Sequence, residues 1–160
     1  MTSPSGNSPT KAPTSTLREI VTTDRDRWAQ LYEWYCQFYK TPFTAEIGDE
    51  VWGWIETAGN GFEGRMIVDV NGETIGLCHF REYPLPLLGK MGGFIDDIFV
   101  DPQARGSGAA AASIEYVKAF GSAHGWATIN WLTGDDNYRA RGVYDRYATR
   151  TLWVTYEIEL

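Results

Sequence analysis

The sequence is poor in the residues that build metal sites and disulfide frameworks. It has two cysteines, Cys36 and Cys78, and two histidines, His79 and His124. Neither cysteine belongs to a CxxC pair or to a group with metal-ligand spacing, which excludes a disulfide scaffold and a histidine-rich metal centre. We therefore expect no bound metal and a reducing, cytoplasmic environment. Both cysteines fit core positions, and the histidines are interpreted as structural or solvent-facing.

Long apolar runs and an excess of positive charge are also absent. No segment approaches the ~20 consecutive apolar residues of a membrane span, and the N-terminus has no apolar signal-peptide core. The chain has 14 Lys and Arg against 21 Asp and Glu, a net charge of -7. Nucleic-acid affinity depends on basic side chains that neutralise phosphates, so a nucleic-acid partner is not expected. The acidic balance favours a cationic small molecule or a basic peptide.

The composition does suffice for one folded domain. Of the 160 residues, 43% are hydrophobic and 14% aromatic, and a chain of this length buries one core. Ser, Thr, Pro, Gly and Asn dominate residues 1–16, which predicts a flexible N-terminal tail before a domain over 17–160. Residue periodicity and turn signals predict a strand at 17–21, helices at 26–40 and 44–57, a hairpin at Asn71-Gly72, a loop at 81–93, a strand at 94–100, a helix at 108–124, a strand at 127–133, a helix at 135–148 and an amphipathic strand at 151–160.

The stretch "DIFVDPQARGSGAAAAS" places a glycine turn between a strand and a helix. Backbone N–H groups at a helix start are unpaired and lie at the positive end of the helix dipole, so they bind phosphates. A P-loop is excluded because no Lys follows Gly108. Gly106, Gly108 and Ala111 satisfy the dinucleotide pattern GxGxxA. Against that alternative, the glycines lie beyond Pro102, no acidic residue ends the next strand, and the chain holds one β-α-β unit.

A third interpretation uses more of the chain. "QARGSG", with the preceding "IFVDP", resembles the coenzyme A signature of the GNAT superfamily of N-acetyltransferases. "NYRARGVYDRYA" resembles the string Asn-x-x-Ala-x-x-aliphatic-Tyr of the family's following helix, with Asn137, Ala140 and Tyr144 on one helical face. The fuller strings resemble its small histone and polyamine acetyltransferase branch. The sequence departs from the family pattern at Ala110, where a third glycine is common, and at Ala148-Thr149, where Gly-Phe often stands.

The resemblance implies a fold and a cofactor. The fold is of the α/β (α+β) class, with a mixed, mostly antiparallel central sheet flanked by helices. The co-substrate is acetyl-CoA, whose pantetheine pairs with the main chain of the strand and whose pyrophosphate lies on the amides of the turn. A homodimer is also implied, which the C-terminal strand would form by pairing with another copy. The implied cofactor-binding residues are Ile98, Phe99, Val100, Gln103, Arg105, Gly106, Ser107, Gly108, Ala109, Ala110 and Asn137.

Two acidic residues and one tyrosine are the candidates for the chemistry. Asp96 and Asp97 interrupt an otherwise apolar strand, and because they are adjacent we expect them on opposite sides of the sheet. The family pattern favours Asp96 as the base, acting through water, with Asp97 helping to bind a cationic acceptor. The alternative is that both carboxylates lie at the frayed start of the strand or pair with arginines. Tyr144 is the expected acid for the leaving thiolate, although its spacing also fits a core aromatic.

The acceptor pocket is expected beside the first helix. The main apolar stripe of this helix, which includes Tyr35 and Tyr39, is interpreted as core. Trp34 and Phe38 lie off that stripe, so they are the predicted substrate-binding residues. The resulting function is acetyl transfer to a primary amine of a small cationic molecule or a lysine side chain. The alternatives are a non-catalytic module that senses acyl-CoA and a dinucleotide-binding enzyme.

Overall fold

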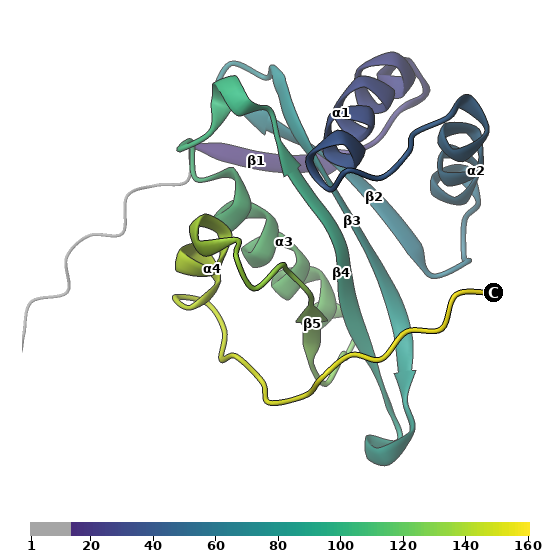
Figure 1. Ribbon diagram of the computed structural model, residues 1–160, viewed down its shortest axis with the longest axis vertical. Coiled ribbons are helices and arrows are strands. Elements are labelled where there is room, and N and C mark those ends of the chain that lie inside the picture. Colours follow the sequence, from purple (N-terminus) through teal and green to yellow (C-terminus); the bar gives the residue numbers. More distant parts are fainter. Residues whose placement is uncertain (1–13) are drawn as a thin grey trace, which may run out of the picture.

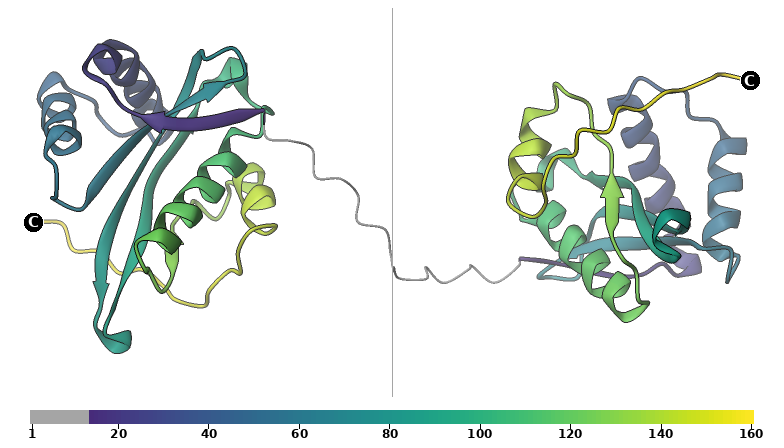
Figure 2. Two further views of the ribbon diagram at one scale, coloured as in Figure 1. Left: turned by 180° about the vertical axis from the view of Figure 1, so that it is seen from behind. Right: turned by 90° about the horizontal axis from the view of Figure 1, so that it is seen from below.

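A computed structural model of the chain describes residues 14–160, which form one mixed sheet with helices on both faces (Figure 1, Figure 2). The strands follow the order β1-β2-β3-β4-β5. Strands β1 to β4 are antiparallel and β5 is parallel to β4, which confirms the predicted fold class. The elements are β1 (Ser15–Glu19), α1 (Arg25–Phe38), α2 (Ala45–Glu56), β2 (Phe62–Asp69), β3 (Thr74–Leu85), β4 (Lys90–Val100), α3 (Ala109–Ala123), β5 (Ile129–Trp131) and α4 (Tyr138–Tyr144). Within residues 14–160, no helix has the length and apolar character needed to cross a membrane.

Each face of the sheet has its own apolar core. On one face, Trp28 and Leu31 of α1 pack with α2 and with Leu77 and Phe99 of the sheet. On the other face, Val117 of α3 packs against a second set of strand residues. Neighbouring residues of β3 alternate between these cores, as the pleat requires. Both cysteines are buried and unpaired, as predicted.

Strands β4 and β5 separate soon after they meet. Only Gly93, Phe94 and Ile95 of β4 pair with β5, so in the described chain the same edge of β4 is left without a strand partner at residues 98–100. Helix α4 follows β5 and lies beside α3 (Figure 1). The sheet therefore opens between the end of β4 and the start of α4.

The predicted loop at 81–93 is wrong, because these residues form the two arms of a long β3–β4 hairpin. Pro84 pairs in register with Met91, and the turn is a short 3-10 helix at Pro86–Leu88. The prolines had argued against a strand. However, β2 pairs with β3 only as far as Arg81, so beyond that point β3 is an edge strand, where a residue without a backbone N–H is tolerated.

Both ends of the chain also differ from prediction. Of the segment predicted as a tail, residues 1–13 lie outside the described chain, but Ser15 and Thr16 already belong to β1, where Ser15 is buried. Residues 151–160 form neither helix nor strand, so the predicted C-terminal strand is wrong for the single chain. The alternating pattern is present, but among residues 14–160 the segment pairs with no strand, and Leu152 and Ile158 are 99% and 86% exposed.

Candidate active site

The glycine turn between β4 and α3 has the conformation that the sequence predicted. Gly106 and Gly108 have φ angles of 90° and 79°, in the left-handed region that side chains other than glycine enter only with strain. Gly108 is the N-cap of α3, so the first amides of that helix are unpaired. The hydroxyls of Thr14 and Ser15 donate hydrogen bonds to the carbonyl of Ser107. The turn is thus fixed to β1 and the residue before it through the carbonyl of Ser107.

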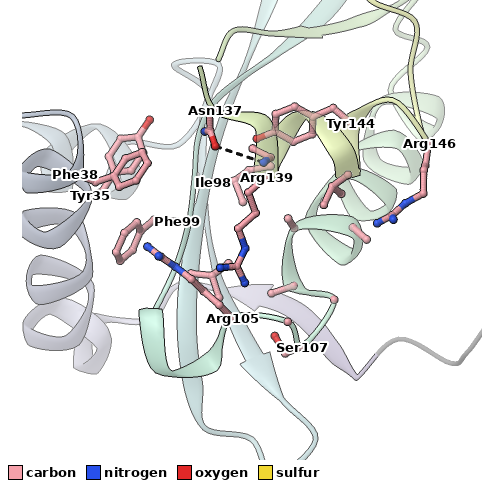
Figure 3. A pocket seen from close by; sticks show the side chains of 18 of the residues that line it. Tyr35, Phe38, Ile98, Phe99, Arg105, Ser107, Asn137, Arg139, Tyr144 and Arg146 are labelled. Atoms are coloured by element: carbon pink, nitrogen blue, oxygen red, sulfur yellow. Dashed lines mark hydrogen bonds between the residues drawn. The ribbon is translucent and has the colours of Figure 1, made fainter. Parts of the chain in front are cut away.

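A cavity of about 440 Å³ lies in the opening between β4 and α4 (Figure 3). It brings together every predicted cofactor-binding residue except Gln103. Its walls come from β4, the turn, the start of α3, α1 and α4. Helix α1 lies on one face of the sheet, whereas α3 and α4 lie on the other (Figure 1). The lining of the cavity is Tyr35, Phe38, Tyr39, Ile98, Phe99, Val100, Arg105, Gly106, Ser107, Gly108, Ala109, Ala110, Ala111, Asn137, Arg139, Ala140, Val143, Tyr144 and Arg146.

Three arginines make this cavity cationic. Arg105 comes from the turn, whereas Arg139 and Arg146 come from α4 and the residues after it, and Figure 3 shows the side chains of Arg105 and Arg139 extending into the cavity. Sequence reasoning missed Arg139 and Arg146. Arg139 lies in α4, whereas Arg146 follows the end of that helix at Tyr144, so no helical period relates the two, and their charge beside the Asn137 motif was the signal available. Guanidinium groups with turn amides suit a ligand that carries several phosphates.

Asn137 and Tyr144 occupy the two ends of α4. The Asn137 side chain accepts a hydrogen bond from the Ala140 amide at 3.3 Å and donates one to the Thr133 hydroxyl at 3.2 Å, so it caps the helix while it lines the cavity. Tyr144 packs against Trp131, with ring centroids 5.5 Å apart. Burial raises the pKa of Tyr144 to about 12. Its phenol therefore stays protonated at neutral pH and has an O–H to donate.

A β-bulge corrects the expected placement of the two carboxylates. In the β3–β4 pairing, Phe80 is opposite Ile95 and His79 is opposite Asp97, so Asp96 is the extra residue. Asp97 contacts His79 and Asp96 contacts Arg81, and both partners lie on the face of β3 that looks toward α1. The carboxylates therefore lie on the same side of the sheet. The prediction of opposite sides was wrong because a bulge inserts one residue and interrupts the alternation.

Asp96 lies at a second cavity, of about 470 Å³. Its side chain is 24% exposed and accepts hydrogen bonds from the Arg81 guanidinium at 2.9 and 3.2 Å. Burial raises the pKa of Asp96 above its usual range, although the bonded Arg81 opposes this change. A carboxylate with a raised pKa is a better proton acceptor near neutral pH. The other residues of this cavity are Tyr32, Tyr35, Cys36, Tyr39, Thr41, Leu132, Thr133 and Gly134.

The two cavities share the side chains of Tyr35 and Tyr39. These tyrosines belong to the apolar stripe of α1 that was predicted as core. Phe38 lines the first cavity and not the second, and Trp34 lines neither, because it packs beside Arg27. The stripe reaches the site because the C-terminal end of α1 extends to the opening of the sheet. Among the described residues, no group of three or more His, Cys, Asp or Glu is placed to hold a metal.

Residues 28–148 match the model of the Acetyltransferase (GNAT) family. The chain belongs to this family. It is an N-acetyltransferase, and GNAT enzymes use acetyl-CoA as co-substrate. Glycine-turn amides and arginines are groups that suit a co-substrate with several phosphates. The dinucleotide alternative is thereby set aside. The histone and polyamine branch stays a prediction.

Named relatives agree on the family and differ in what they acetylate. The chain is 24% identical over 142 residues to the D-amino-acid N-acetyltransferase HPA3 of Saccharomyces cerevisiae, covering 88% of each protein. Among solved structures, the ribosomal-protein-alanine N-acetyltransferase of Brucella melitensis biovar Abortus 2308 has 23% identity and a TM-score of 0.73, with 91% of this chain and 99% of that chain covered. A Trypanosoma brucei acetyltransferase has 17% identity and a TM-score of 0.70, with coverage of 91% and 99%. At these identities the structural likeness establishes the fold alone.

The arginines of the first cavity lead to a binding prediction. We expect Arg139→Gln to weaken coenzyme A binding by about 10- to 150-fold, since one charge-assisted hydrogen bond contributes roughly 1.5–3 kcal/mol. Lys118→Gln is the control, because it removes the same charge from an exposed site on α3 outside the cavity. Isothermal titration with coenzyme A measures both. Equal affinities for the two variants would contradict the assignment.

Proposed function

We propose that the enzyme transfers the acetyl group of acetyl-CoA directly to a primary amine of a small cationic molecule or of a lysine side chain. The observation that supports this most is the junction of the two cavities at Tyr35 and Tyr39, with Tyr144 in the first cavity and Asp96 in the second. A thioester in the first cavity and an amine in the second would meet at this junction.

The cofactor is bound by main-chain and charged groups. The free edge of β4 at residues 98–100 pairs with the amides of the pantetheine arm as an added strand would. The amides from Arg105 to Ala110 bind the pyrophosphate at the N-terminus of α3. Arg105, Arg139 and Arg146 supply positive charge for the phosphates. This arrangement fixes the thioester at the inner end of the cavity.

The chemistry then needs one proton acceptor and one proton donor. An alkyl ammonium, with a pKa near ~10.4, must lose a proton before its nitrogen attacks. Asp96 accepts that proton through water, the amine nitrogen bonds to the acetyl carbon, and the carbon–sulfur bond breaks. Tyr144 donates its O–H toward the departing thiolate. Cys78 is not a nucleophile, because burial raises the pKa of its thiol and leaves it unexposed.

The surroundings of the second cavity support a cationic acceptor. Three tyrosines and the carboxylate of Asp96 line it, and aromatic faces with negative charge attract ammonium groups. A free amino acid is a second candidate, because Arg81 is 47% exposed beside Asp96 and a guanidinium binds a carboxylate. The name of the yeast relative gives this candidate further support.

We also propose that the enzyme is a homodimer joined through residues 151–160. On one side of this segment lie Leu152, Val154, Tyr156, Ile158 and Leu160, each at least 72% exposed. In the described part of the chain, β5 is paired on one side only. An extended segment with an apolar side fits such an edge, and the segment of a second copy would cover β5 while burying that side.

The first prediction for function concerns Tyr144. Tyr144→Phe is expected to lower kcat by about 10²- to 10⁴-fold, because the leaving thiolate loses its proton donor, while KM for acetyl-CoA stays unchanged. Tyr138→Phe is the control, since Tyr138 is on the same helix and 75% exposed. Steady-state release of free thiol measures both variants. An unchanged kcat in Tyr144→Phe would remove it from the chemistry.

A second prediction concerns pH. If Asp96 accepts the proton, kcat/KM rises with pH as its carboxyl ionises, and this acid limb lies above the usual range because burial raises the pKa of Asp96. Arg81→Gln removes the hydrogen bond that opposes this shift, so the acid limb should move to higher pH. Arg25→Gln, whose partner is the exposed Asp49, serves as the control. The part of the pH profile that reflects ionisation of the amine is the same for all variants. If Arg81→Gln does not move the acid limb of kcat/KM, this result argues against Asp96 as the base.

A third prediction tests the dimer. Val154→Asp with Ile158→Asp puts charge on the apolar side of the C-terminal segment and should give a monomer in light scattering. Thr151→Asp with Thr155→Asp adds the same charge on the opposite side and should leave the dimer intact. A monomeric wild type, or a dimer that survives the first pair of changes, would contradict the proposal.

A further inference from the structure

Strand β3 holds a histidine, His79, beside the proposed active site. The chemistry proposed above does not use this histidine. His79 has no exposed surface. The rings of Trp28, Tyr32 and Phe62 lie around it, with centroids 5.9, 5.4 and 5.5 Å from the imidazole. A polar ring enclosed by aromatic side chains is stable only if both nitrogens are hydrogen-bonded.

Each nitrogen has one partner, and together the partners fix the tautomer. The Trp28 indole nitrogen lies 2.9 Å from His79 Nε2, and Asp97 Oδ2 lies 2.8 Å from His79 Nδ1. An indole N–H only donates, so Nε2 has to accept with a lone pair. The ring proton is then on Nδ1, which donates to Asp97. The aromatic core of α1 is thereby connected to the carboxylate of Asp97, next to the bulge of β4, by two hydrogen bonds in series.

Asp97 is the end of this hydrogen-bond chain that lies nearer to the second cavity. Asp97 itself lines neither cavity and its side chain is 16% exposed, but its neighbour Asp96 lines the second cavity. The pKa values of Tyr32 and Tyr35, which line the same cavity, are raised by burial and by the negative charge of Asp97. The orientation of this carboxylate therefore affects the electrostatics of the wall that an amine would meet.

We propose that His79 is a positioning residue for acetyl transfer, whose Nδ1–H holds Asp97 in one orientation beside the acceptor amine. This inference rests on the proposed function, because it assumes an amine in the second cavity. A carboxylate that is free to rotate would lose this conformational freedom each time an amine binds, which weakens binding. With Oδ2 fixed by His79, Asp97 is ready to receive a cation.

Purely structural packing would not need this arrangement. The same position in the core would accept a leucine or phenylalanine if filling space were its only task. A buried polar pair of this kind contributes little net stability over an apolar replacement, and so is better explained by what it orients. The experiment must therefore separate lost stability from lost orientation.

The decisive comparison uses three variants of the full chain. His79→Leu keeps the volume and removes the donor to Asp97, and His79→Asn restores an N–H in place of Nδ1. Leu77→Ala, two residues earlier on the same face and equally buried, damages packing only. We expect His79→Leu to lower kcat/KM for the amine by about 10- to 100-fold, as typically follows when an orienting partner is lost. KM for acetyl-CoA stays at the wild-type value, His79→Asn recovers most of the loss, and Leu77→Ala lowers the melting temperature with near wild-type kcat/KM.

The outcomes separate the two proposals. A wild type that acetylates no amine overturns the proposed function and this inference with it. An active wild type in which His79→Leu matches Leu77→Ala, or in which His79→Asn gives no recovery, overturns the inference alone. If His79→Leu does not fold, the imidazole ¹⁵N signals of the wild type still decide, because the chain has two histidines and His124→Gln assigns them. We expect a proton on Nδ1 of His79 at neutral pH, and one on Nε2 alone would overturn the inference.

Discussion

The separation of β4 from β5 after Ile95 is the constraint on which the site depends. While the strands are paired, both edges of β4 are used by the sheet. Beyond Ile95 the edge is released, and α1, α4 and the glycine turn reach the opening from three directions. Had the pairing continued to Val100, a strand would occupy the place proposed for the cofactor. The sheet topology thus creates the cavity, and the side chains that line it determine which ligand it can bind.

The bulge at Asp96 is the second constraint, and it acts over a single residue. A regular strand would have placed one carboxylate toward α1 and the other toward α3. The inserted residue turns both toward α1, where His79 and Arg81 each hold one of them. Two neighbouring acids thereby acquire different surroundings, one enclosed with a histidine and one beside a cavity with an arginine. Two carboxylates in different surroundings can have different chemical roles within one site.

The sequence predicted those parts of the molecule that local patterns determine. Gly106 and Gly108 were informative because few residues other than glycine adopt positive φ angles. Asn137 and Tyr144 were informative because their helical spacing places them on one face of the helix. Asp96 and Asp97 were identified by type, but their direction was not, because a bulge leaves no period to detect. Tyr35 and Tyr39 were taken as core because a helix stripe does not reveal where the sheet beneath it ends. Whether the hairpin arms near Pro84 and segment 151–160 form strands depends on which strand edges have neighbours. The sequence of a single segment does not contain this information about pairing.

The contacts of the first strand with the glycine turn carry a practical consequence. Thr14 and Ser15 both donate hydroxyl hydrogen bonds to the carbonyl of Ser107, at the centre of the loop proposed to hold the pyrophosphate. A shortened version of the protein that starts at Thr16 would remove both donors and leave the peptide plane of Ser107 free to rotate. Protein engineers who trim the N-terminus beyond Ser15 would therefore alter the glycine turn, although the two segments are more than 90 residues apart in the chain.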